Sequence, residues 1–258
     1  MSQPKKVLII IPCYNEAASI GPLLRELYSL TIDENFELKA AVINDCSTDN
    51  TADVVRRFSD AVLLDLPVNL GIGGAMQTGF KYAYENGFDY AIQADGDGQH
   101  PVSVIPDLLS EAEKGNCDIV IGSRFLEKKG FQSSTARRAG IRYFKQLNRA
   151  LTGITVTDNT SGFRLFNKRA LELSVQYYPD KYPEPESIIV FALNGLTIKE
   201  IPVEMNERQG GVSSISAFSA VYYMCKVTLG IFYTFMRLKT QFKWQRSRSS
   251  LSLQVYSS

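Results

Sequence analysis

The 258-residue chain is 45% hydrophobic and 21% charged, with a formal net charge of +1, one histidine and four cysteines. This is the composition of a soluble globular protein that is long enough for a full hydrophobic core. The single histidine, His100, excludes a zinc centre with several histidine ligands. Four scattered cysteines without a Cys-x-x-Cys pair indicate thiols in a reducing compartment, and the short apolar run after a polar start predicts no secretory signal.

Charge is distributed unevenly along the chain. After Glu207 there are seven basic residues and no acidic one, whereas the preceding part has 21 basic and 27 acidic residues, a balance of −6. This asymmetry predicts that the C-terminal part meets an anionic surface. We expect no nucleic-acid partner.

Five largely apolar runs, the first of them rich in β-branched residues, predict strands, and a helix-forming segment follows each of them. The runs are Val7–Ile11, Leu38–Asn44, Val62–Leu66, Phe88–Ala94 and Asp118–Ile121. Helices are expected over about 19–30, from 51, up to about 86 and over 187–193. Alternation of strands and helices predicts an α/β fold, with a mostly parallel sheet flanked by helices and ligands at the carboxyl ends of the strands.

Two aspartates, Asp95 and Asp97, follow the fourth run and are separated by one glycine. Alternate residues of an extended chain point to the same side, so both carboxylates can reach one Mg²⁺ or Mn²⁺ that bridges to a diphosphate. A solvated turn is the alternative, because Asp-Gly pairs are common in turns. A calcium loop is excluded, since Gln99 and Pro106 occupy positions that require acidic ligands.

Two other nucleotide-binding classes lack their motif after the first strand. The turn there is Pro12-Cys-Tyr-Asn-Glu16, not the Gly-x-Gly-x-x-Gly of dinucleotide-binding proteins, and Gly71, Gly73 and Gly74 follow the third strand instead. A sugar nucleotidyltransferase would need a glycine-rich, basic triphosphate loop at the same place. Both classes are therefore disfavoured.

Several motifs occur together in one order. They are Ile11-Pro-Cys-Tyr-Asn-Glu16, Asn44-Asp-Cys-Ser-Thr-Asp49, Asn69-Leu-Gly-Ile-Gly73, Asp95-Gly-Asp-Gly-Gln-His-Pro101, Gly122-Ser-Arg-Phe125, Thr160-Ser-Gly-Phe-Arg164 and Arg208-Gln-Gly-Gly-Val-Ser213. From about Val7 to Ser214 the chain thereby resembles the family-2 glycosyltransferases of the type A fold. The resemblance is to the branch of dolichyl-phosphate mannose synthases and polyprenyl-phosphate glucosyltransferases.

The resemblance implies roles for individual residues. Those that match the nucleotide-sugar site are Pro12, Tyr14, Glu16, Asp45, Asp95 and Gln99, and those that match the metal site are Asp95 and Asp97. Acceptor phosphate would be bound by Arg124, Arg164 and Ser161, and the catalytic residues would be Asp97, Glu186 and Arg208. Guanidinium groups suit phosphate because they are permanently charged and bind two oxygens at once. A salt bridge or a solvated surface is the alternative for each arginine.

The acceptor decides whether a base is needed. A sugar hydroxyl must lose a proton to a carboxylate, for which Glu186 is the first candidate and Glu184 the second, whereas a lipid phosphate is already an anion. Either glutamate can instead be an acid that stabilises a helix N-terminus. The chain departs from its relatives at Cys46, which replaces a glycine and predicts a turn without positive φ, and at Ser214, which replaces a lysine.

The C-terminal membrane spans of those relatives are also missing. The segment Ile215–Met236 is nearly uncharged, but Lys226 near its middle disfavours a membrane span. A helical wheel places one set of residues on an apolar face: Phe218, Val221, Tyr222, Cys225, Leu229, Phe232 and Met236. The opposite face carries Ser219, Tyr223, Lys226, Gly230, Thr234 and Arg237. This pattern predicts a helix in the membrane interface or against a membrane partner, with a packed core or oligomer helix and a true span as alternatives.

Together these features predict a catalytic domain over 1–214, an amphipathic helix over 215–246 and a disordered tail over 247–258. The expected function is inverting, metal-dependent transfer of one sugar from a nucleotide-sugar to a polyprenyl phosphate or lipid-linked glycan. The expected location is peripheral, on the cytoplasmic face of the membrane, with an anionic membrane surface or a membrane protein as partner and a possible homo-oligomer. A non-catalytic nucleotide-sugar-binding subunit of a membrane complex is the alternative from another class.

Overall fold

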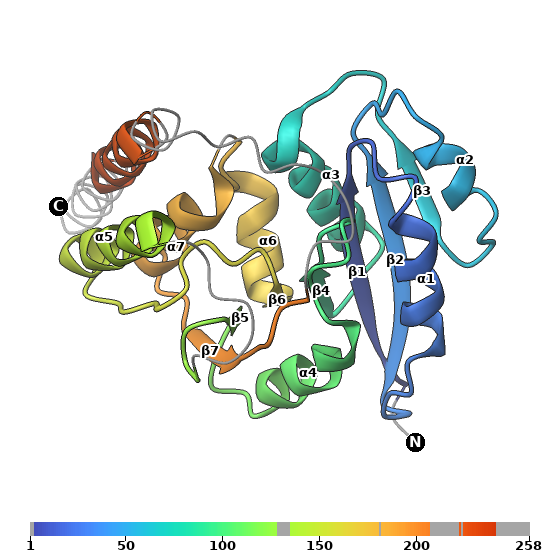
Figure 1. The fold of residues 1–258 in the computed structure, drawn as a ribbon. Coiled ribbons are helices and arrows are strands. Elements are labelled where there is room, and N and C mark those ends of the chain that lie inside the picture. The colour runs from blue at the N-terminus through green and yellow to red at the C-terminus, as the bar shows by residue number, and fades with distance from the viewer. Residues whose placement is uncertain (1–2, 128–134, 181, 207–221, 223, 241–258) are drawn as a thin grey trace, which may run out of the picture.

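The computed structural model describes residues 3–127, 135–180, 182–206, 222 and 224–240. Within them, seven strands form one sheet in the order β3-β2-β1-β4-β6-β5-β7, with helices on both sides (Figure 1). The strands are β1 (Lys5–Cys13), β2 (Phe36–Asn44), β3 (Val62–Asp65), β4 (Tyr90–Gln93), β5 (Ile119–Ser123), β6 (Arg164–Asn167) and β7 (Ile198–Pro202). The helices are α1 (Ile20–Ser29), α2 (Thr51–Val55), α3 (Gly71–Glu85), α4 (Ile105–Glu113), α5 (Thr135–Thr152), α6 (Lys168–Tyr177) and α7 (Pro183–Leu193), with a 3₁₀ turn at Val102–Val104.

The sheet is mostly parallel, as the sequence predicts. β1 lies between β2 and β4 and is parallel to both, and all five predicted strands are present. Only β6 runs antiparallel, between β4 and β5. The sequence analysis did not predict β6 or β7, because these strands are short and carry charged residues in place of a continuous apolar run.

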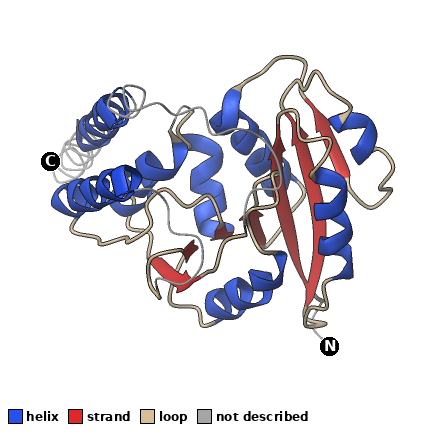
Figure 2. Ribbon diagram, in the orientation of Figure 1, coloured by secondary structure: helices blue, strands red, loops and turns tan. Residues whose placement is uncertain are grey.

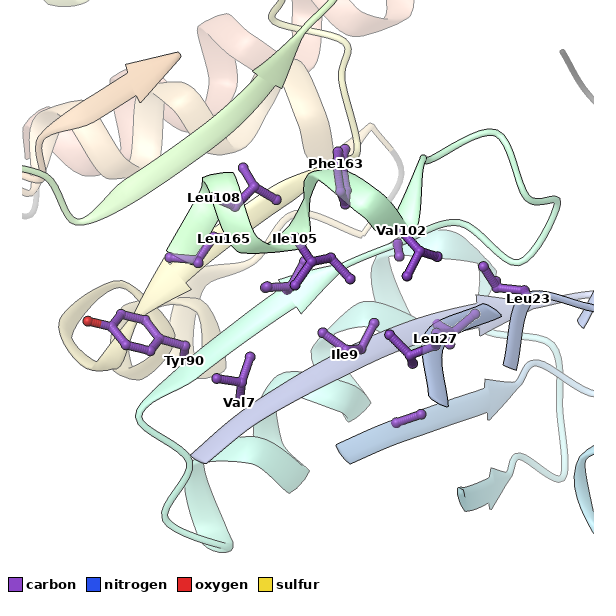
Figure 3. Packing of buried hydrophobic residues seen from close by; sticks show 14 of the residues in the cluster. Val7, Ile9, Leu23, Leu27, Tyr90, Val102, Ile105, Leu108, Phe163 and Leu165 are labelled. Atoms are coloured by element: carbon purple, nitrogen blue, oxygen red, sulfur yellow. The ribbon is translucent and has the colours of Figure 1, made fainter. Parts of the chain in front are cut away.

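Each face of the sheet has its own hydrophobic core. On one face, Ile9 of β1 and Leu165 of β6 pack with residues of α1 and α4, such as Leu27 and Leu108 (Figure 3). On the other face, side chains of α3, α6 and α7 cover the sheet, with Phe80 of α3 stacked edge-on against Phe166 of β6. Because both faces are covered, the polar loops lie at the strand ends, as is usual for sheets of this kind (Figure 2).

Residues 224–240 form a further helix beside α5, and Val227 and Ile231 of this helix pack on Phe144 of α5 and Ile189 of α7 (Figure 1). Of the C-terminal helix predicted over 215–246, the part at 224–240 is helical and one of its faces is packed, whereas residues 215–221, 223 and 241–246 lie outside the described residues. Among the described residues, no helix has both the length and the apolar character that a membrane crossing requires.

Candidate functional site

Three polar turns meet at one edge of the sheet. They lie at the end of β1 (Pro12–Glu16) and after β2 (Asp45–Asp49) and β4 (Asp95–Gln99), and these strands are direct neighbours with β1 in the middle. Burial and the negative charges of Glu16 and Asp95 raise the pKa of the Cys13 thiol. The structure thus brings together the residues predicted to bind a nucleotide-sugar.

Asn15 ties the turn after β1 to the turn after β2. Its side-chain oxygen accepts hydrogen bonds from the backbone N–H groups of Thr48 (2.8 Å) and Asp49 (3.3 Å), and its own N–H donates to Ser47 Oγ (2.9 Å). Asn15 and Cys46 both have φ of +59°. The prediction that the turn at Cys46 avoids positive φ is therefore wrong. Left-handed backbone there lets the chain bring Ser47 and Thr48 to Asn15.

Asp45 is buried and its carboxylate accepts two backbone hydrogen bonds at the start of α3, from Leu70 (2.7 Å) and Gly71 (2.9 Å). The negative charge also suits the positive end of the helix dipole. Asp45 thereby fixes α3 against the site. Tyr14 is about half exposed beside it, so its ring is accessible to a ligand.

The Asp95–His100 loop is held by its own polar groups. The N–H of Asp95 donates to His100 Nδ1 (2.9 Å), Asp95 Oδ2 lies 3.6 Å from His100 Nε2, and Asp97 Oδ1 accepts from the N–H of Gln99 (3.0 Å). Burial lowers the pKa of His100 to about 4, so the ring is neutral and accepts through Nδ1. His100 also stacks on Phe163, with 5.0 Å between ring centroids. Sequence reasoning did not give His100 this role, although it follows the two aspartates directly.

Glycines allow the loops to approach one another closely. A Cβ at Gly96 would lie 2.5 Å from Cys13 Sγ, and a Cβ at Gly162 would lie 2.9 Å from Gln93 Nε2 and 3.3 Å from Asp95 Oδ1. Larger residues at these positions would displace the Asp95 carboxylate or the end of β1.

Arg124, predicted to bind phosphate, makes a two-pronged ion pair with Asp158. Its Nε and Nη2 donate to the two carboxylate oxygens, both at 2.7 Å, and Nη2 also donates to Thr160 Oγ1. Burial alone would lower the pKa of Arg124, but the hydrogen bonds to Asp158 raise it, and Asp95 adds to the rise. Arg124 therefore lies within the field of the Asp95 carboxylate.

Asp158 and its support were missed by the sequence analysis. Glu200 of β7 accepts hydrogen bonds from the N–H groups of Thr157 (2.7 Å) and Asp158 (2.8 Å), which places the Asp158 carboxylate. The sequence signal for Asp158 was its carboxylate three residues before Ser161, within reach of the predicted site. Ser161 itself is buried, and its hydroxyl donates to the carbonyl of Gly122 (2.6 Å).

Arg164 has no solvent exposure. Its guanidinium donates to the carbonyls of Ser161 (2.7 Å), Asn159 (3.3 Å) and Glu184 (3.0 Å) and to Ser187 Oγ (2.8 Å). It thereby joins the loop before β6 to the first turn of α7. The acceptor-phosphate role assigned to Arg164 remains a prediction, and it would require the guanidinium to leave these partners.

The two candidate bases lie in different surroundings, because residues two apart on a helix point in nearly opposite directions. Burial raises the pKa of Glu184, the charge of Arg164 opposes this rise, and the charge of Asp95 adds to it. Gln93 is close enough to lower that pKa, yet its Nε2 makes no hydrogen bond of normal geometry.

Glu186 faces helix 224–240 instead. A Cβ at Gly230 would overlap its carboxylate. Burial and then the charge of Asp180 raise the pKa of Glu186 to about 7, opposed by Thr234 and Arg237 of that helix. Arg208, the third predicted catalytic residue, lies outside the described residues.

The family model for glycosyl transferase family 2 matches residues 8–173, which include all three turns and the Thr160–Arg164 segment. The chain belongs to glycosyl transferase family 2. The resemblance seen in the motifs is thereby confirmed.

Named relatives of this family-2 protein act on lipid phosphates. A UDP-N-acetylglucosamine–dolichyl-phosphate N-acetylglucosaminyltransferase from Methanococcus voltae is 30% identical over 219 residues, covering 78% of this chain and 85% of the relative. An undecaprenyl-phosphate mannosyltransferase from Micrococcus luteus is 31% identical, over 82% of this chain and 88% of the relative.

Solved structures confirm the predicted type A fold of this family-2 protein. A glucosyl-3-phosphoglycerate synthase from Mycobacterium tuberculosis, in complex with Mn²⁺, UDP-glucose and phosphoglyceric acid, superposes with a TM-score of 0.69 at 15% identity, covering 90% of this chain and 80% of that one. A mannosyltransferase from Pyrobaculum calidifontis, in complex with GDP-mannose and Mn²⁺, superposes with a TM-score of 0.55 at 20% identity, covering 81% of this chain and 58% of that one.

The metal site predicted at Asp95 and Asp97 would use two carboxylates of this family-2 protein. No three His, Cys, Asp or Glu side chains in the described part of the chain are grouped as a complete metal cage. Asp95, whose side chain is 38% exposed, and Asp97 would supply two oxygens and leave the other positions to phosphate oxygens and water. Mg²⁺ and Mn²⁺ are commonly bound in this way.

Proposed function

We propose that this family-2 glycosyltransferase transfers one sugar from a nucleotide-sugar to a polyprenyl phosphate, with inversion at the sugar carbon. The relatives from Methanococcus voltae and Micrococcus luteus support this acceptor through their names. Mg²⁺ or Mn²⁺ would be the cofactor, as the Mn²⁺ complexes of proteins with the same fold suggest.

One observation carries the proposal: the turns after β1, β2 and β4 converge at the carboxyl edge of the sheet. In this proposal Tyr14, Glu16 and Asp45 bind the nucleoside. Asp95 and Asp97 bind the diphosphate together with the metal ion. Such an edge is the usual ligand site of a parallel α/β sheet.

The chemistry requires no proton transfer at the attacking atom. An anionic oxygen of the lipid phosphate forms a bond to the sugar carbon, while the bond from that carbon to the nucleotide diphosphate breaks and its electron pair leaves with the diphosphate. A divalent ion at Asp95 and Asp97, when bound, neutralises the charge on the departing diphosphate. We infer that Arg124, whose pKa Asp95 helps to raise, contributes to holding a phosphate of donor or acceptor.

The surroundings of Glu186 support an anionic acceptor. This first candidate for a base is packed against helix 224–240, whereas the charge of Asp95 raises the pKa of the second candidate, Glu184. A lipid phosphate does not need the base that a sugar hydroxyl would need. If a hydroxyl is the true acceptor, Glu184 is the better base on these contacts.

We propose that the protein is peripheral on the cytoplasmic face of the membrane, with residues 1–214 as the catalytic domain and 215–246 as the membrane-directed part. Cytoplasmic nucleotide-sugars and membrane-bound lipid phosphates meet at that face. The predicted tail over 247–258 lies outside the described residues.

A donor screen tests the proposal. The purified full chain is incubated with Mn²⁺ or Mg²⁺, a short polyprenyl phosphate and a panel of UDP-, GDP- and dTDP-sugars, and nucleoside diphosphate release is measured. Release from one donor that depends on metal and lipid phosphate supports the proposal. Nucleotide-sugar binding without release from any donor would overturn it and favour a non-catalytic nucleotide-sugar-binding subunit.

A further inference from the structure

Helix 224–240 is packed on one face only. Val227, Ile231, Thr234 and Leu238 are buried at a spacing of three or four residues, which defines one side of a helix. Val227 and Ile231 pack with Phe144 of α5, and Gly230 contacts Glu186 of α7. This face fixes the helix to the catalytic domain.

The opposite face is apolar and exposed. It consists of Leu229, Phe232, Tyr233 and Met236, together with Tyr222 just before the helix, and we call these residues the outer face. Leu229 and Tyr233 are each 69% exposed and Met236 is 58% exposed. Five of the fourteen exposed large hydrophobic residues in the described part of the chain thus lie between positions 222 and 236. Such clustering, unlike scattered exposed apolar residues, marks an interaction surface.

Basic residues flank the outer face. Lys226, Arg237 and Lys239 are exposed, and the chain has no acidic residue after Glu207. Lys226 Nζ lies 4.4 Å from the ring centroid of Tyr222, so cation and aromatic ring are presented together. Exposed aromatic and aliphatic side chains beside cations are typical of helices that lie in the headgroup region of a bilayer.

We propose that the outer face of helix 224–240 docks in the interface of an anionic lipid bilayer, with the helix axis along the membrane plane. Leu229, Phe232 and Met236 enter the acyl boundary, while Lys226 and Lys239 contact anionic headgroups. A second copy of the chain fits this surface less well, because a symmetric contact between two outer faces would bring their basic residues together.

Docking in this way also sets the position of the catalytic site. α7 carries Glu186 against helix 224–240 and, two residues earlier, Glu184 in the field of Asp95. One short helix therefore links the membrane-bound surface to the donor site. Docking would hold the headgroup of a lipid phosphate near that site. This consequence rests on the proposed function, whereas bilayer docking itself does not.

Vesicle co-sedimentation tests the docking. The full chain is mixed with vesicles of phosphatidylcholine alone or with 30 mol% phosphatidylglycerol, a chosen composition of about one anionic lipid in three. We expect binding to the anionic vesicles that weakens at high salt. The double substitution Leu229→Glu, Met236→Glu should weaken vesicle binding at least about tenfold, because it places charges in the apolar contact. The double substitution Lys226→Gln, Lys239→Gln should weaken it about 25-fold, since each basic residue near the surface contributes roughly fivefold.

Tyr84→Glu is the matched control, because Tyr84 is an exposed apolar residue on α3, and it should leave vesicle binding unchanged. Circular dichroism checks that each variant keeps its helices. Equal binding of wild type and the outer-face variant would overturn the proposal. Absence of vesicle binding would also overturn it. In that case, a dimer in analytical ultracentrifugation that the variant loses would assign the outer face to a second copy of the chain. A monomer would assign the outer face to a membrane protein. Transfer to a short, water-soluble lipid phosphate should be unchanged in the variant, so loss of docking and failure of the proposed function remain distinguishable.

Discussion

Replacing Glu186 by glutamine should make the protein more stable at neutral pH. The folded chain raises the pKa of this carboxyl from 4.5 to about 7, chiefly by burial against helix 224–240. The folded state therefore favours the protonated form. The contribution of the protonated Glu186 carboxyl to the free energy of unfolding is fully present below pH 4.5 and is lost as the pH rises through 7. Glutamine remains neutral and has nearly the same shape, so the variant avoids this loss.

The size of the effect follows from the two pKa values. One pKa unit corresponds to about 1.4 kcal/mol, so ionisation of Glu186 lowers the free energy of unfolding by about 3 kcal/mol between pH 4.5 and pH 8. The difference in free energy of unfolding between Glu186→Gln and wild type should grow by up to that amount over this range. If helix 224–240 detaches before the domain unfolds, its docking free energy limits the gain.

Urea unfolding of both proteins at several pH values between 4.5 and 8.5 measures this difference. Glu85→Gln, at an exposed glutamate of α3, shows how much of the pH dependence comes from removing any one carboxylate. A Glu186→Gln difference that does not change with pH would refute the packing of Glu186 against helix 224–240. If the Glu186→Gln protein is fully stable but no longer transfers sugar to a lipid phosphate, Glu186 is a catalytic group instead.

Three further substitutions test other contacts. Asp97→Asn should abolish nucleoside diphosphate release but keep the melting temperature, because asparagine can still accept the hydrogen bond from Gln99; full activity would contradict a metal role. Arg164→Met should lower the free energy of unfolding by about 3 kcal/mol in urea titrations, since three carbonyls and a hydroxyl lose a buried charged donor. An unaffected fold with weakened acceptor binding would support the phosphate role instead. Cys46→Gly should raise the free energy of unfolding by up to about 1 kcal/mol, because glycine adopts φ of +59° without strain; a less stable variant would contradict this.

Much of the sheet and the location of the site can be predicted from sequence. Strands buried on both faces are continuous apolar runs, and Val7–Ile11 and Phe88–Ala94 end directly in polar turns. β7 has no such signal, because two consecutive charged residues, Lys199 and Glu200, interrupt the apolar residues of Ile198–Pro202. One of those charged residues, Glu200, places the Thr157–Asp158 turn from a strand far away in the sequence. Tertiary partners of this kind leave no local pattern.

The orientation of individual side chains was less predictable. Arg164 lies in a motif that is expected to bind phosphate, but its partners in the structure are mostly backbone carbonyls. Every residue carries a carbonyl, so such partners cannot be recognised from residue types. Glu184 and Glu186 differ only in which side of α7 they occupy. That side is set by the packing of helix 224–240, about forty residues later in the chain. Likewise, the positive φ of Cys46 follows from the contacts of Asn15 with the next turn, against the preference of a non-glycine residue.

The central claim is that an anionic lipid phosphate attacks the donor sugar. It is tested most directly by comparing a short polyprenyl phosphate with the corresponding polyprenol, at the same concentration, in an assay of metal-dependent nucleoside diphosphate release. We expect release with the phosphate and none above background with the alcohol. Equal release with the polyprenol, lost in Glu184→Gln, would contradict it and show attack by a hydroxyl with Glu184 as the base.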